Sequence, residues 1–336
     1  MKTKTNYSAQ GGNIDISVVI VNYKSWSHLK NCLGYLMDIP QDSFTFEVIV
    51  IDNCSNDNKF SEFSSEFSRC KFIENPINGG FSNGCNIGAR SAKGDYLLFL
   101  NPDTIATKHA FLTMLLIARK HPEYGAISCT KITKKGVPET EARLFPKLSR
   151  LFGLLRAIDK LLNKNKLAER FDPSKEVIFP DWVSGSVFFI SKQWFDKLGG
   201  WNEDFWLYLE DVDFCKRIAE AGGKIVLTRA TKVNHNHGGA SRLDVKTSAL
   251  TKVEVIISKH VYFHNHFKGF YKFTVQVLFV MAKLIDKFLF AIIGAIFFFV
   301  PKLKVHLFIF FNLIGYYLNA MTKSTWISKR ALNYKS

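Results

Sequence analysis

The sequence predicts an α/β protein with a doubly wound, mainly parallel sheet, followed by a helical C-terminal region. From residue 14 to about residue 237, short β-branched or aromatic runs alternate with segments of helix length. The strand candidates are apolar at consecutive positions, which is typical of parallel strands covered by helices on both faces. Beyond residue 245 the pattern is helical only. We therefore expect a disordered N-terminus over residues 1–13, a sheet domain over 14–244 and a helical region over 245–336.

Five strand candidates open the sheet domain, and polar residues follow most of them. Their sequences are ISVVIV, TFEVIVID, KFIEN, DYLLFL and GAISC, at residues 16–21, 45–52, 71–75, 95–100 and 125–129. In doubly wound sheets ligands bind beyond the carboxyl ends of the parallel strands. The side chains at those positions are Asn22, Tyr23, Asp52, Asn53, Asn75, Asn101 and Asp103.

The second half of the sheet domain is less regular. Residues 131–153 are rich in Lys, Arg and Pro and weakly periodic, which predicts a mobile basic loop with at most one short helix. Long loops in compact domains often act as lids or binding loops. A strand over 184–191 follows, then a short helix closed by Gly199 and Gly200, and a helix over 209–222.

Charge is concentrated in the helical region. The chain has a net charge of +16, and residues 252–336 hold twelve Lys and Arg against two acids, a balance of +10. These lysines flank the apolar runs 288–300 and 307–318, a pattern that favours a membrane surface over nucleic acid as the partner. The runs are shorter than the roughly 20 residues that span a bilayer, so we expect a peripheral or re-entrant attachment. The alternatives are a single membrane span over residues 305–321, packing on the sheet domain or a homo-oligomer core.

One helix of this region shows a polar stripe. Lys272, Gln276, Lys283 and Lys287 fall on one side at 100° per residue, with apolar residues around the rest. Such a helix is expected to lie in the membrane interface. The first residues of the chain lack the apolar stretch of a signal peptide, so the expected location is the cytoplasm. The six cysteines form no C-x-x-C pair and are expected to be reduced thiols.

Two strand-end aspartates are candidates for ligand binding. Asp103 follows a buried strand and a proline, and a hard oxygen ligand there suits Mg²⁺ or Mn²⁺ bridging a diphosphate. Equally, it could cap the helix that starts near Thr104. Asp52 could accept a hydrogen bond from a pyrimidine imide or form a plain Asx turn. Gly79 and Gly80 open the next helix, where backbone amides suit a nucleotide, although no P-loop or G-x-G-x-x-G pattern is present.

The helix in WNEDFWLYLEDVDFCKRIAEAGGK carries a candidate general base. Asp211 shares its side with apolar residues, and partial desolvation would raise its pKa and make it a better base. The alternative is a carboxylate that the helix dipole stabilises. Four charged residues at 3-4-3 spacing are predicted to form the solvated face of this helix: Glu210, Asp213, Arg217 and Glu220. Four aromatic residues just before this helix could form a platform on which a sugar stacks, and we call them the aromatic approach: Trp201, Phe205, Trp206 and Tyr208.

Two histidines follow in VNHNHGGAS. His235 and His237 lie two residues apart, on one face if the segment is extended. One of them could reach a metal ion or a phosphate oxygen, whereas a structural role is the more common one for such a pair. The sequence does not choose between these roles.

Six segments in this order resemble the large inverting glycosyltransferase family known as family 2, which has the GT-A fold. They are ISVVIVNYKSW, VIVIDNCSND, NGGFSNGCNIGARSAKGDYLLFLNPDT, SGSVFFIS, LGGWNEDFWLYLEDVDFCKRI and HNHGGAS, within about residues 14–241. The similarity is greatest to bacterial rhamnosyltransferases of cell-surface polysaccharide assembly, in which NPD replaces the more common Asp-x-Asp. Asn101 takes the first position of that motif here, so metal binding would depend mainly on Asp103.

The resemblance implies roles for these residues. Asp52 would contact the nucleotide base, Asp103 the divalent ion on the diphosphate, and Asp211 would deprotonate the acceptor hydroxyl. The donor nucleotide site is expected at Asn22, Tyr23, Asp52, Asn53, Asn78, Gly79, Gly80, Asn86 and Asn101. The metal site is expected at Asp103 and His237, with Mg²⁺ or Mn²⁺. The acceptor site is expected at Trp182, Gly185, Trp206, Tyr208 and Glu210.

The expected activity is transfer of a sugar from a nucleotide diphosphate donor. The resemblance favours dTDP-rhamnose as the donor, followed by UDP-hexoses or galactofuranose. A basic, apolar C-terminal region suits a polyprenyl-linked saccharide acceptor at the cytoplasmic face of the membrane. A nucleotidyltransferase would use a similar sheet, but it normally has a Gly-rich loop after the first strand, where this chain has VNYKSWSHL. A non-catalytic membrane scaffold would explain the helical region but not the position of Asp211.

Overall fold

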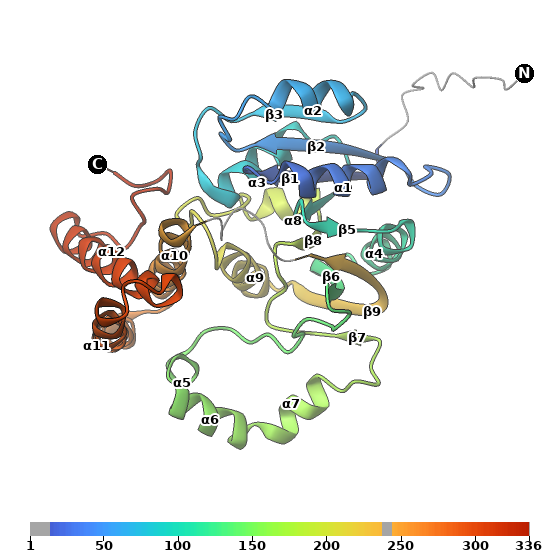
Figure 1. The fold of residues 1–336 in the computed structure, drawn as a ribbon. Coiled ribbons are helices and arrows are strands. Elements are labelled where there is room, and N and C mark those ends of the chain that lie inside the picture. The colour runs from blue at the N-terminus through green and yellow to red at the C-terminus, as the bar shows by residue number, and fades with distance from the viewer. Residues whose placement is uncertain (1–13, 237–243, 336) are drawn as a thin grey trace, which may run out of the picture.

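A nine-stranded mixed sheet forms the centre of the protein in the computed structural model, which describes residues 14–236 and 244–335 (Figure 1). The strands are β1 (Ile16–Asn22), β2 (Phe46–Asp52), β3 (Lys71–Glu74), β4 (Tyr96–Leu100), β5 (Thr104–Ile105), β6 (Tyr124–Thr133), β7 (Val177–Ile178), β8 (Val187–Ser191) and β9 (Lys224–His235). Their order is β3-β2-β1-β4-β8-β6-β9-β5, and β7 pairs with β9. The strands β1 to β4 pair in parallel, and β8 is antiparallel to β4 and β6.

Helices cover both faces of this sheet, as predicted. They are α1 (Trp26–Met37), α2 (Phe60–Glu66), α3 (Gly80–Ser91), α4 (Lys108–Lys120), α8 (Lys192–Lys197) and α9 (Glu210–Glu220). One apolar core lies under α1, α2 and α4, and a second under α3, α8 and α9. Neighbouring strand residues point into different cores: Leu98 into the first and Phe99 into the second. This explains why the strands are apolar at consecutive positions.

Two parts of the sheet domain differ from the sequence prediction. Residues 131–153, predicted as a loop with at most one short helix, carry α5 (Leu148–Leu151), but the helices that follow, α6 (Gly153–Leu162) and α7 (Lys164–Arg170), were not predicted. The long strand β9 was not predicted, because polar residues interrupt its apolar pattern where exposed and buried positions alternate. It pairs with β6 over most of its length, which also extends β6 to Thr133.

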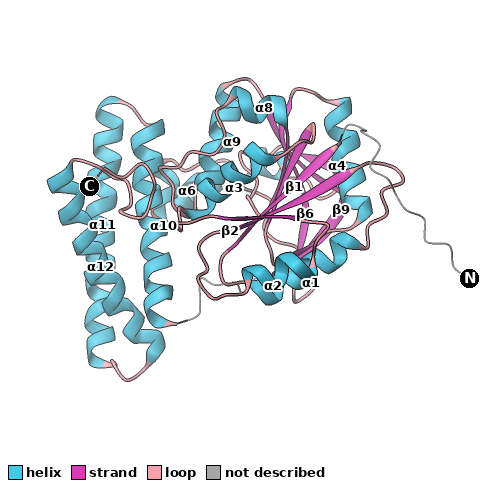
Figure 2. Ribbon diagram, turned by 90° about the horizontal axis from the view of Figure 1, so that it is seen from above, coloured by secondary structure: helices cyan, strands magenta, loops and turns pink. Residues whose placement is uncertain are grey.

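The C-terminal region consists of three long helices, α10 (Val245–His266), α11 (Gly269–Ile296) and α12 (Pro301–Lys323), which lie side by side next to the sheet domain (Figure 2). Their shared core includes Tyr262, Phe279 and Leu313, and it continues into Phe205 and Val212 of the sheet domain. Of the helices in the described part of the chain, α12 is long and apolar enough to cross a membrane, with a mean hydropathy of 1.3 over 18 residues.

The polar stripe predicted for α11 does not face outward. Gln276 is buried, and its Nε2 donates a hydrogen bond of 2.9 Å to the carbonyl oxygen of His260. Lys283 and Lys287 are half-buried, whereas apolar residues on other sides of the helix are exposed, Phe273 at 65% and Ile285 at 59%. The reason is that α10 presents a buried histidine to α11, a partner that the spacing within α11 could not reveal. The exposed face of α11 is therefore apolar.

Candidate active site

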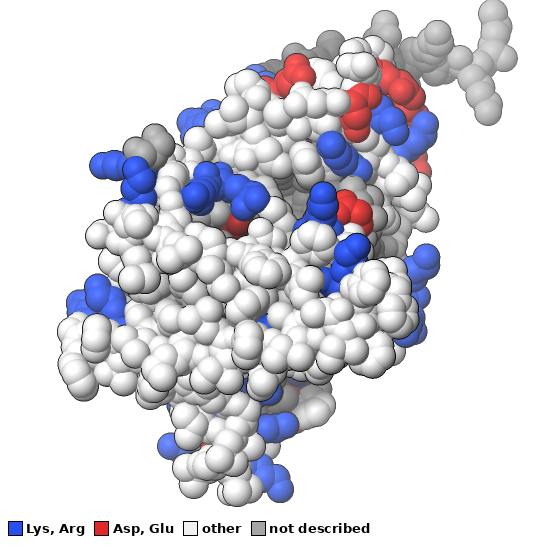
Figure 3. Space-filling model, turned by 60° about the vertical axis from the view of Figure 1, so that its left-hand side comes forward, with Lys and Arg blue, Asp and Glu red and all other residues white. Residues whose placement is uncertain are grey.

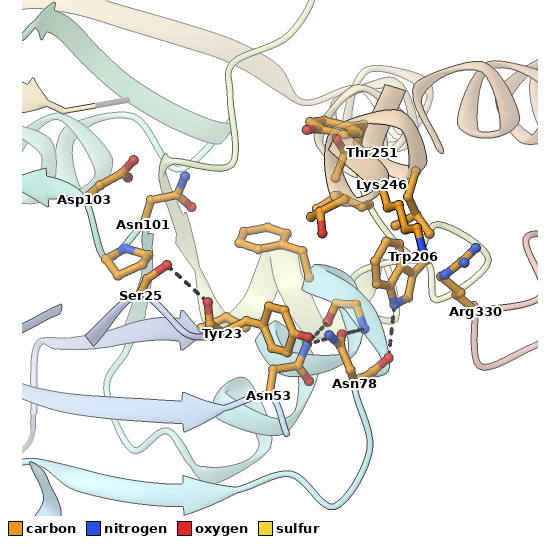
Figure 4. A pocket seen from close by; sticks show the side chains of 18 of the residues that line it. Tyr23, Ser25, Asn53, Asn78, Asn101, Asp103, Trp206, Lys246, Thr251 and Arg330 are labelled. Atoms are coloured by element: carbon orange, nitrogen blue, oxygen red, sulfur yellow. Dashed lines mark hydrogen bonds between the residues drawn. The ribbon is translucent and has the colours of Figure 1, made fainter. Parts of the chain in front are cut away.

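A pocket of about 840 Å³ opens beyond the carboxyl ends of β1 and β4 (Figure 4). Eight of the predicted site residues line it: Tyr23, Asn53, Asn78, Gly80, Asn101, Asp103, Trp206 and Tyr208. The opposite wall comes from α10 and from the segment after α12, and it includes Lys246, Thr251 and Arg330. The strand-end residues and the aromatic approach thus meet in one pocket.

Side-chain amides hold the loops on the sheet side of this pocket. Asn53 Nδ2 donates hydrogen bonds to Asn78 Oδ1 at 3.0 Å and to the Gly80 carbonyl oxygen at 3.1 Å. Asn75 Nδ2 donates to Asn53 Oδ1 at 2.8 Å. The ends of β2 and β3 and the start of α3 are therefore fixed relative to one another.

Asp52 and Asn22 lie behind the pocket wall. Asp52 is 2% exposed, and its Oδ1 accepts hydrogen bonds from Asn22 Nδ2 at 3.0 Å and from Ser55 Oγ at 2.5 Å. Asn22 Oδ1 in turn accepts from the Ser25 amide at 3.2 Å. These contacts shape the turns after β1 and β2, and neither residue is among those that line the pocket in the described chain.

Gly80 joins α3 to the aromatic approach. Its φ is +85°, and a Cβ there would stand 2.0 Å from the carbonyl oxygen of Trp206. That oxygen accepts a hydrogen bond from the Phe81 amide at 3.0 Å, and Trp206 Nε1 donates to the Asn78 carbonyl oxygen at 3.0 Å. Only glycine allows this close approach without strain, so Gly80 lets the Trp206 backbone lie against the start of α3.

The predicted site residues Gly79 and Asn86 do not line the pocket. A Cβ at Gly79 would stand 2.5 Å from Asn83 Oδ1, which shows how closely that side chain packs. Asn86 Nδ2 donates to the Trp201 carbonyl oxygen at 2.9 Å and to Glu203 Oε1 at 2.7 Å. In this structure Asn86 therefore fixes the start of the aromatic approach.

Asp103 begins a chain of charged contacts. Its Oδ1 lies 3.3 Å from His235 Nε2, and His235 Nδ1 lies 2.6 Å from Glu139 Oε1. Glu139 Oε2 is 3.1 Å from Lys131 Nζ and 3.2 Å from Arg143 Nη2. His237, the other predicted histidine, lies outside the described residues.

This arrangement shifts the pKa values of its members. Burial by itself would raise the pKa of Glu139, but the hydrogen bond with His235 and the charge of Lys131 outweigh it and hold the pKa well below its usual range. Burial would lower the pKa of His235, but the carboxylates of Asp103 and Glu139 outweigh it and raise the pKa. His235 is thus favoured in its protonated form between two carboxylates.

The position of Asp103 fits a divalent ion that a substrate shares. Its Oδ1 is buried and accepts no well-formed hydrogen bond from the described residues. No group of three or more His, Cys, Asp or Glu side chains that could hold an ion occurs in residues 14–236 or 244–335. Mg²⁺ and Mn²⁺ need only one or two protein carboxylates when a diphosphate and water supply the other oxygens.

Asp211 is held by two backbone amides at the start of α9. Its Oδ2 accepts a hydrogen bond from Gly185 at 3.1 Å, and its Oδ1 accepts one from Val212 at 2.8 Å. Burial raises its pKa, against the opposing effects of the Gly185 hydrogen bond and the Arg143 charge. Tyr208 and Leu209 just before it have φ of +70° and +61°. Two consecutive left-handed non-glycine residues are strained, and such strain clusters at functional sites.

Asp211 lies one residue behind the pocket wall. A Cβ on its partner Gly185 would stand 3.1 Å from the ring of Phe81, and Phe81 lines the pocket. Asp211 itself is not among the lining residues. Among the three aspartates, therefore, Asp103 faces the pocket directly, whereas Asp52 and Asp211 lie immediately behind its lining.

The solvated face predicted for α9 was wrong for two of its members. Glu210 is 7% exposed, and burial together with the charge of Asp211 raises its pKa well above the usual range. Asp213 is 1% exposed and lies 2.8 Å from both Arg217 and His266. The reason is that other helices cover this side of α9: His266 of α10 contacts Asp213, and Glu210 lies close enough to Cys85 of α3 to act on it electrostatically.

Trp182 lines a second, more open pocket of about 640 Å³ together with Glu139 and Arg143. Its Nε1 donates to the Leu144 carbonyl oxygen at 3.2 Å, and the Arg143 guanidinium lies 4.5 Å from its ring centre. Arg143 thus joins this pocket to Asp211 electrostatically. Of the predicted acceptor residues, Trp206 and Tyr208 line the first pocket and Trp182 the second.

Comparisons with known proteins identify the fold and the family. Residues 17–181 match the model of glycosyl transferase family 2, and residues 170–238 match the N-terminal domain of galactosyltransferase. The sheet domain belongs to glycosyltransferase family 2.

Curated relatives of this glycosyltransferase align with about two thirds of the chain. A low-salt glycan biosynthesis hexosyltransferase, Agl10 from Haloferax volcanii, is 28% identical, over 66% of this chain and 67% of the relative. Rhamnosyltransferase WbbL of Escherichia coli is 24% identical, over 62% and 79%. An N-acetylglucosaminyl-diphospho-decaprenol L-rhamnosyltransferase of Mycobacterium tuberculosis is 24% identical, over 68% and 78%.

A solved structure confirms the GT-A type of fold. The crystal structure of GalNAc-T7 with UDP, GalNAc and Mn²⁺ superposes with a TM-score of 0.54 at 18% identity, over 74% of this chain and 48% of that one. At this identity the similarity concerns the fold alone.

Sequence reasoning missed one wall of the glycosyltransferase pocket. Lys246, Thr247, Leu250 and Thr251 of α10 and Arg330 line it, yet all belong to the region that the sequence assigned to membrane binding. No short motif marks these residues. The signal in the sequence is weak: Asp244 precedes a helical pattern as an N-cap, and its side chain accepts hydrogen bonds from the amides of Lys246 and Thr247.

Proposed function

We propose that this glycosyltransferase transfers a sugar with inversion from a nucleotide diphosphate donor to a saccharide on a polyprenyl diphosphate carrier. L-Rhamnose from dTDP-rhamnose is the proposed sugar, because two of the relatives are named rhamnosyltransferases. The observation that carries the proposal is the position of Asp211 beside the pocket that holds the strand-end residues.

Asp211 is the proposed general base. The acceptor oxygen attacks the anomeric carbon from the face opposite the diphosphate, and a bond from carbon to the acceptor oxygen forms as the bond to the donor phosphate oxygen breaks. The electron pair leaves with the nucleoside diphosphate, and the acceptor proton moves to Asp211. A raised pKa makes its carboxylate a stronger base, and the Gly185 and Val212 amides fix its orientation.

The sheet side of the pocket is the proposed donor site. Asn53, Asn78 and Gly80 would contact the nucleoside, with Asp52 holding their loops from behind. Asp103 would hold Mg²⁺ or Mn²⁺, and the ion would neutralise charge on the leaving diphosphate. His235 keeps the Asp103 carboxylate oriented toward the pocket.

The acceptor is proposed to be lipid-linked, and the enzyme to work at the cytoplasmic face of the membrane. The exposed apolar residues of α11 support this, and so does the relative whose name specifies a decaprenol-linked acceptor. The proposed attachment is peripheral, through α11, with α12 packed against it.

A panel of nucleotide sugars tests the proposal. The purified protein is given Mn²⁺, a short-chain polyprenyl diphosphate saccharide and one donor at a time, and product formation is measured by mass spectrometry. The proposal predicts the fastest transfer from dTDP-rhamnose. Faster transfer from a UDP-hexose would change the donor, in line with the hexosyltransferase relative. The absence of transfer and of hydrolysis with every donor would contradict the proposed activity.

A further inference from the structure

The chain returns to the pocket after its last helix. At Ser324, where φ is +50°, it leaves α12 and folds back across α10. Ser328 Oγ donates a hydrogen bond of 2.9 Å to Glu254 Oε1, and Asn333 Nδ2 donates one of 2.9 Å to Asp204 Oδ1. The segment is therefore anchored both to the helical region and to the aromatic approach.

Glu254 positions a cation at the end of this segment. Its carboxylate is 1% exposed, and Arg330 Nη1 lies 3.2 Å from its Oε1. The Arg330 guanidinium also lies 5.8 Å from the centre of the Trp206 ring, within reach of a cation–π interaction. A buried carboxylate that holds an arginine at a pocket wall fixes the direction in which that arginine acts.

A second cation lies on the same wall. Lys246 belongs to the first turn of α10, where the side chain of Asp244 caps the helix. Around it the wall carries the hydroxyl residues Thr247 and Thr251. The carboxylate among the described lining residues, that of Asp103, stands at the other end of the pocket (Figure 4). The end of the pocket away from Asp103 and its partner His235 thus carries two cations, Lys246 and Arg330.

We propose that Lys246 and Arg330 form an anion site that binds the diphosphate of the lipid-linked acceptor. This inference rests on the proposed function, and it assigns a substrate group to a wall that the donor chemistry does not use. Arginine and lysine are the side chains that bind phosphate groups by charge-assisted hydrogen bonds. A donor diphosphate at Asp103 would leave this end of the pocket to another anion.

The position of the wall favours the acceptor. The helix α10 carries Lys246, and it packs against α11 and α12, whose exposed residues are largely apolar. Figure 3 shows that side of the molecule as a broad surface that is mostly free of charge, with Lys and Arg along its edges. Because the lipid tail stays in the membrane, the diphosphate that joins it to the sugar has to enter from the membrane side of the pocket.

Calorimetry on the full-length protein tests the site, with farnesyl diphosphate as the probe and dTDP with Mn²⁺ already bound. The variant carrying Lys246→Gln and Arg330→Gln should bind farnesyl diphosphate at least about tenfold more weakly than the wild type, since charged hydrogen bonds are lost. Its affinity for dTDP should stay within about twofold of the wild-type value. Lys252→Gln, an exposed lysine of the same helix outside the pocket, is the matched control and should change neither affinity.

Three results would overturn the inference. The first is unchanged binding of farnesyl diphosphate to the double variant, and the second is no binding of farnesyl diphosphate to the wild type. The third is a loss of dTDP affinity in the double variant as large as its loss of farnesyl diphosphate affinity, which would assign the two cations to the donor site. Arg330→Lys keeps the charge beside Glu254 and should retain most of the binding, so it separates loss of the site from misfolding. Transfer to a neutral glycoside as efficient as to a diphosphate-linked acceptor would leave the proposed function intact and refute the site. If the wild type binds the probe but transfers no sugar, only the proposed function fails.

Discussion

The Gly185 amide donates a hydrogen bond to Oδ2 of Asp211 over 3.1 Å and thereby joins the turn before β8 to the first turn of α9. The other carboxylate oxygen accepts from Val212 at 2.8 Å. Both oxygens are oriented by backbone amides, which cannot rotate away as side chains can. A carboxylate held in this way is suited to accept a proton from one direction.

Replacing Asp211 with Asn should slow sugar transfer by about 10²–10⁴-fold, the usual contribution of a general base. The amide keeps the size and polarity of the side chain but cannot take the proton. Binding of dTDP with Mn²⁺, measured by calorimetry, should remain within about twofold of the wild type. Glu220→Gln, an exposed carboxylate on the same helix, serves as the control and should leave the rate unchanged. Near-normal turnover by Asp211→Asn would show that the base lies elsewhere.

The pH profile should report the environment of Asp211. Burial raises its pKa, so the acid limb of kcat/KM should lie above the value of about 3.9 for an ordinary aspartate. The positive charge of Arg143 lowers this pKa, so Arg143→Gln should raise it further and move the acid limb to higher pH. Arg143→Lys should restore the wild-type profile because it restores the charge. Identical acid limbs in all three proteins would argue against Asp211 as the titrating group.

Asp103→Asn should weaken the binding of dTDP in the presence of Mn²⁺ by at least about tenfold, since the amide is a poor ligand for a hard cation. The effect should be much smaller when the titration is repeated in EDTA. This difference separates loss of the ion from a general disturbance of the pocket. An equal effect with and without Mn²⁺ would remove the ion-binding role.

Gly80→Ala and Gly222→Ala form a matched pair for the pocket geometry. Both glycines have φ of +85°, but a Cβ at Gly80 would meet the Trp206 carbonyl oxygen, whereas nothing lies within 4 Å at Gly222. The strained backbone should cost about 1–3 kcal/mol of unfolding free energy in both variants. Gly80→Ala should lose more stability and also lose dTDP affinity. Equal losses in the two variants would show that the contact with Trp206 is unimportant.

Membrane binding should depend on the exposed apolar face of α11. Phe273 and Ile285 are 65% and 59% exposed. Changing both to Asp should reduce flotation with liposomes that contain anionic lipid, because apolar burial and charge attraction are both weakened. The same substitution at exposed Leu116 of α4, on the sheet domain, provides a control for nonspecific effects. Unchanged flotation would place the membrane contact on another surface.

Much of the fold could be predicted from the sequence because its cause is local. The apolar runs of β1, β2 and β4 and the polar residues after them mark a parallel sheet and the edge where ligands bind. The strand β9 was missed because its pattern makes sense only beside β6. Likewise, the spacing in α9 and α11 indicates which residues share a side, but not which side another helix covers.

The same difference between local patterns and long-range contacts applies to the residues of the site. Asp103 and Asp211 could be predicted from the sequence, because Asp103 follows an apolar strand and Asp211 shares a side of its helix with apolar residues. Glu139 and Arg330 could not, because their importance depends on partners far away in the chain: Glu139 lies against His235, and Arg330 against Glu254. Long-range contacts therefore set the electrostatics of a site whose outline the local sequence predicts.

The anomeric configuration of the product tests the central claim most directly. The enzyme would be incubated with dTDP-rhamnose and a diphosphate-linked acceptor, and the new linkage would be assigned by NMR. A single displacement assisted by Asp211 predicts a configuration opposite to that of the donor. Retention of the donor configuration would contradict this mechanism and the role of Asp211 in it.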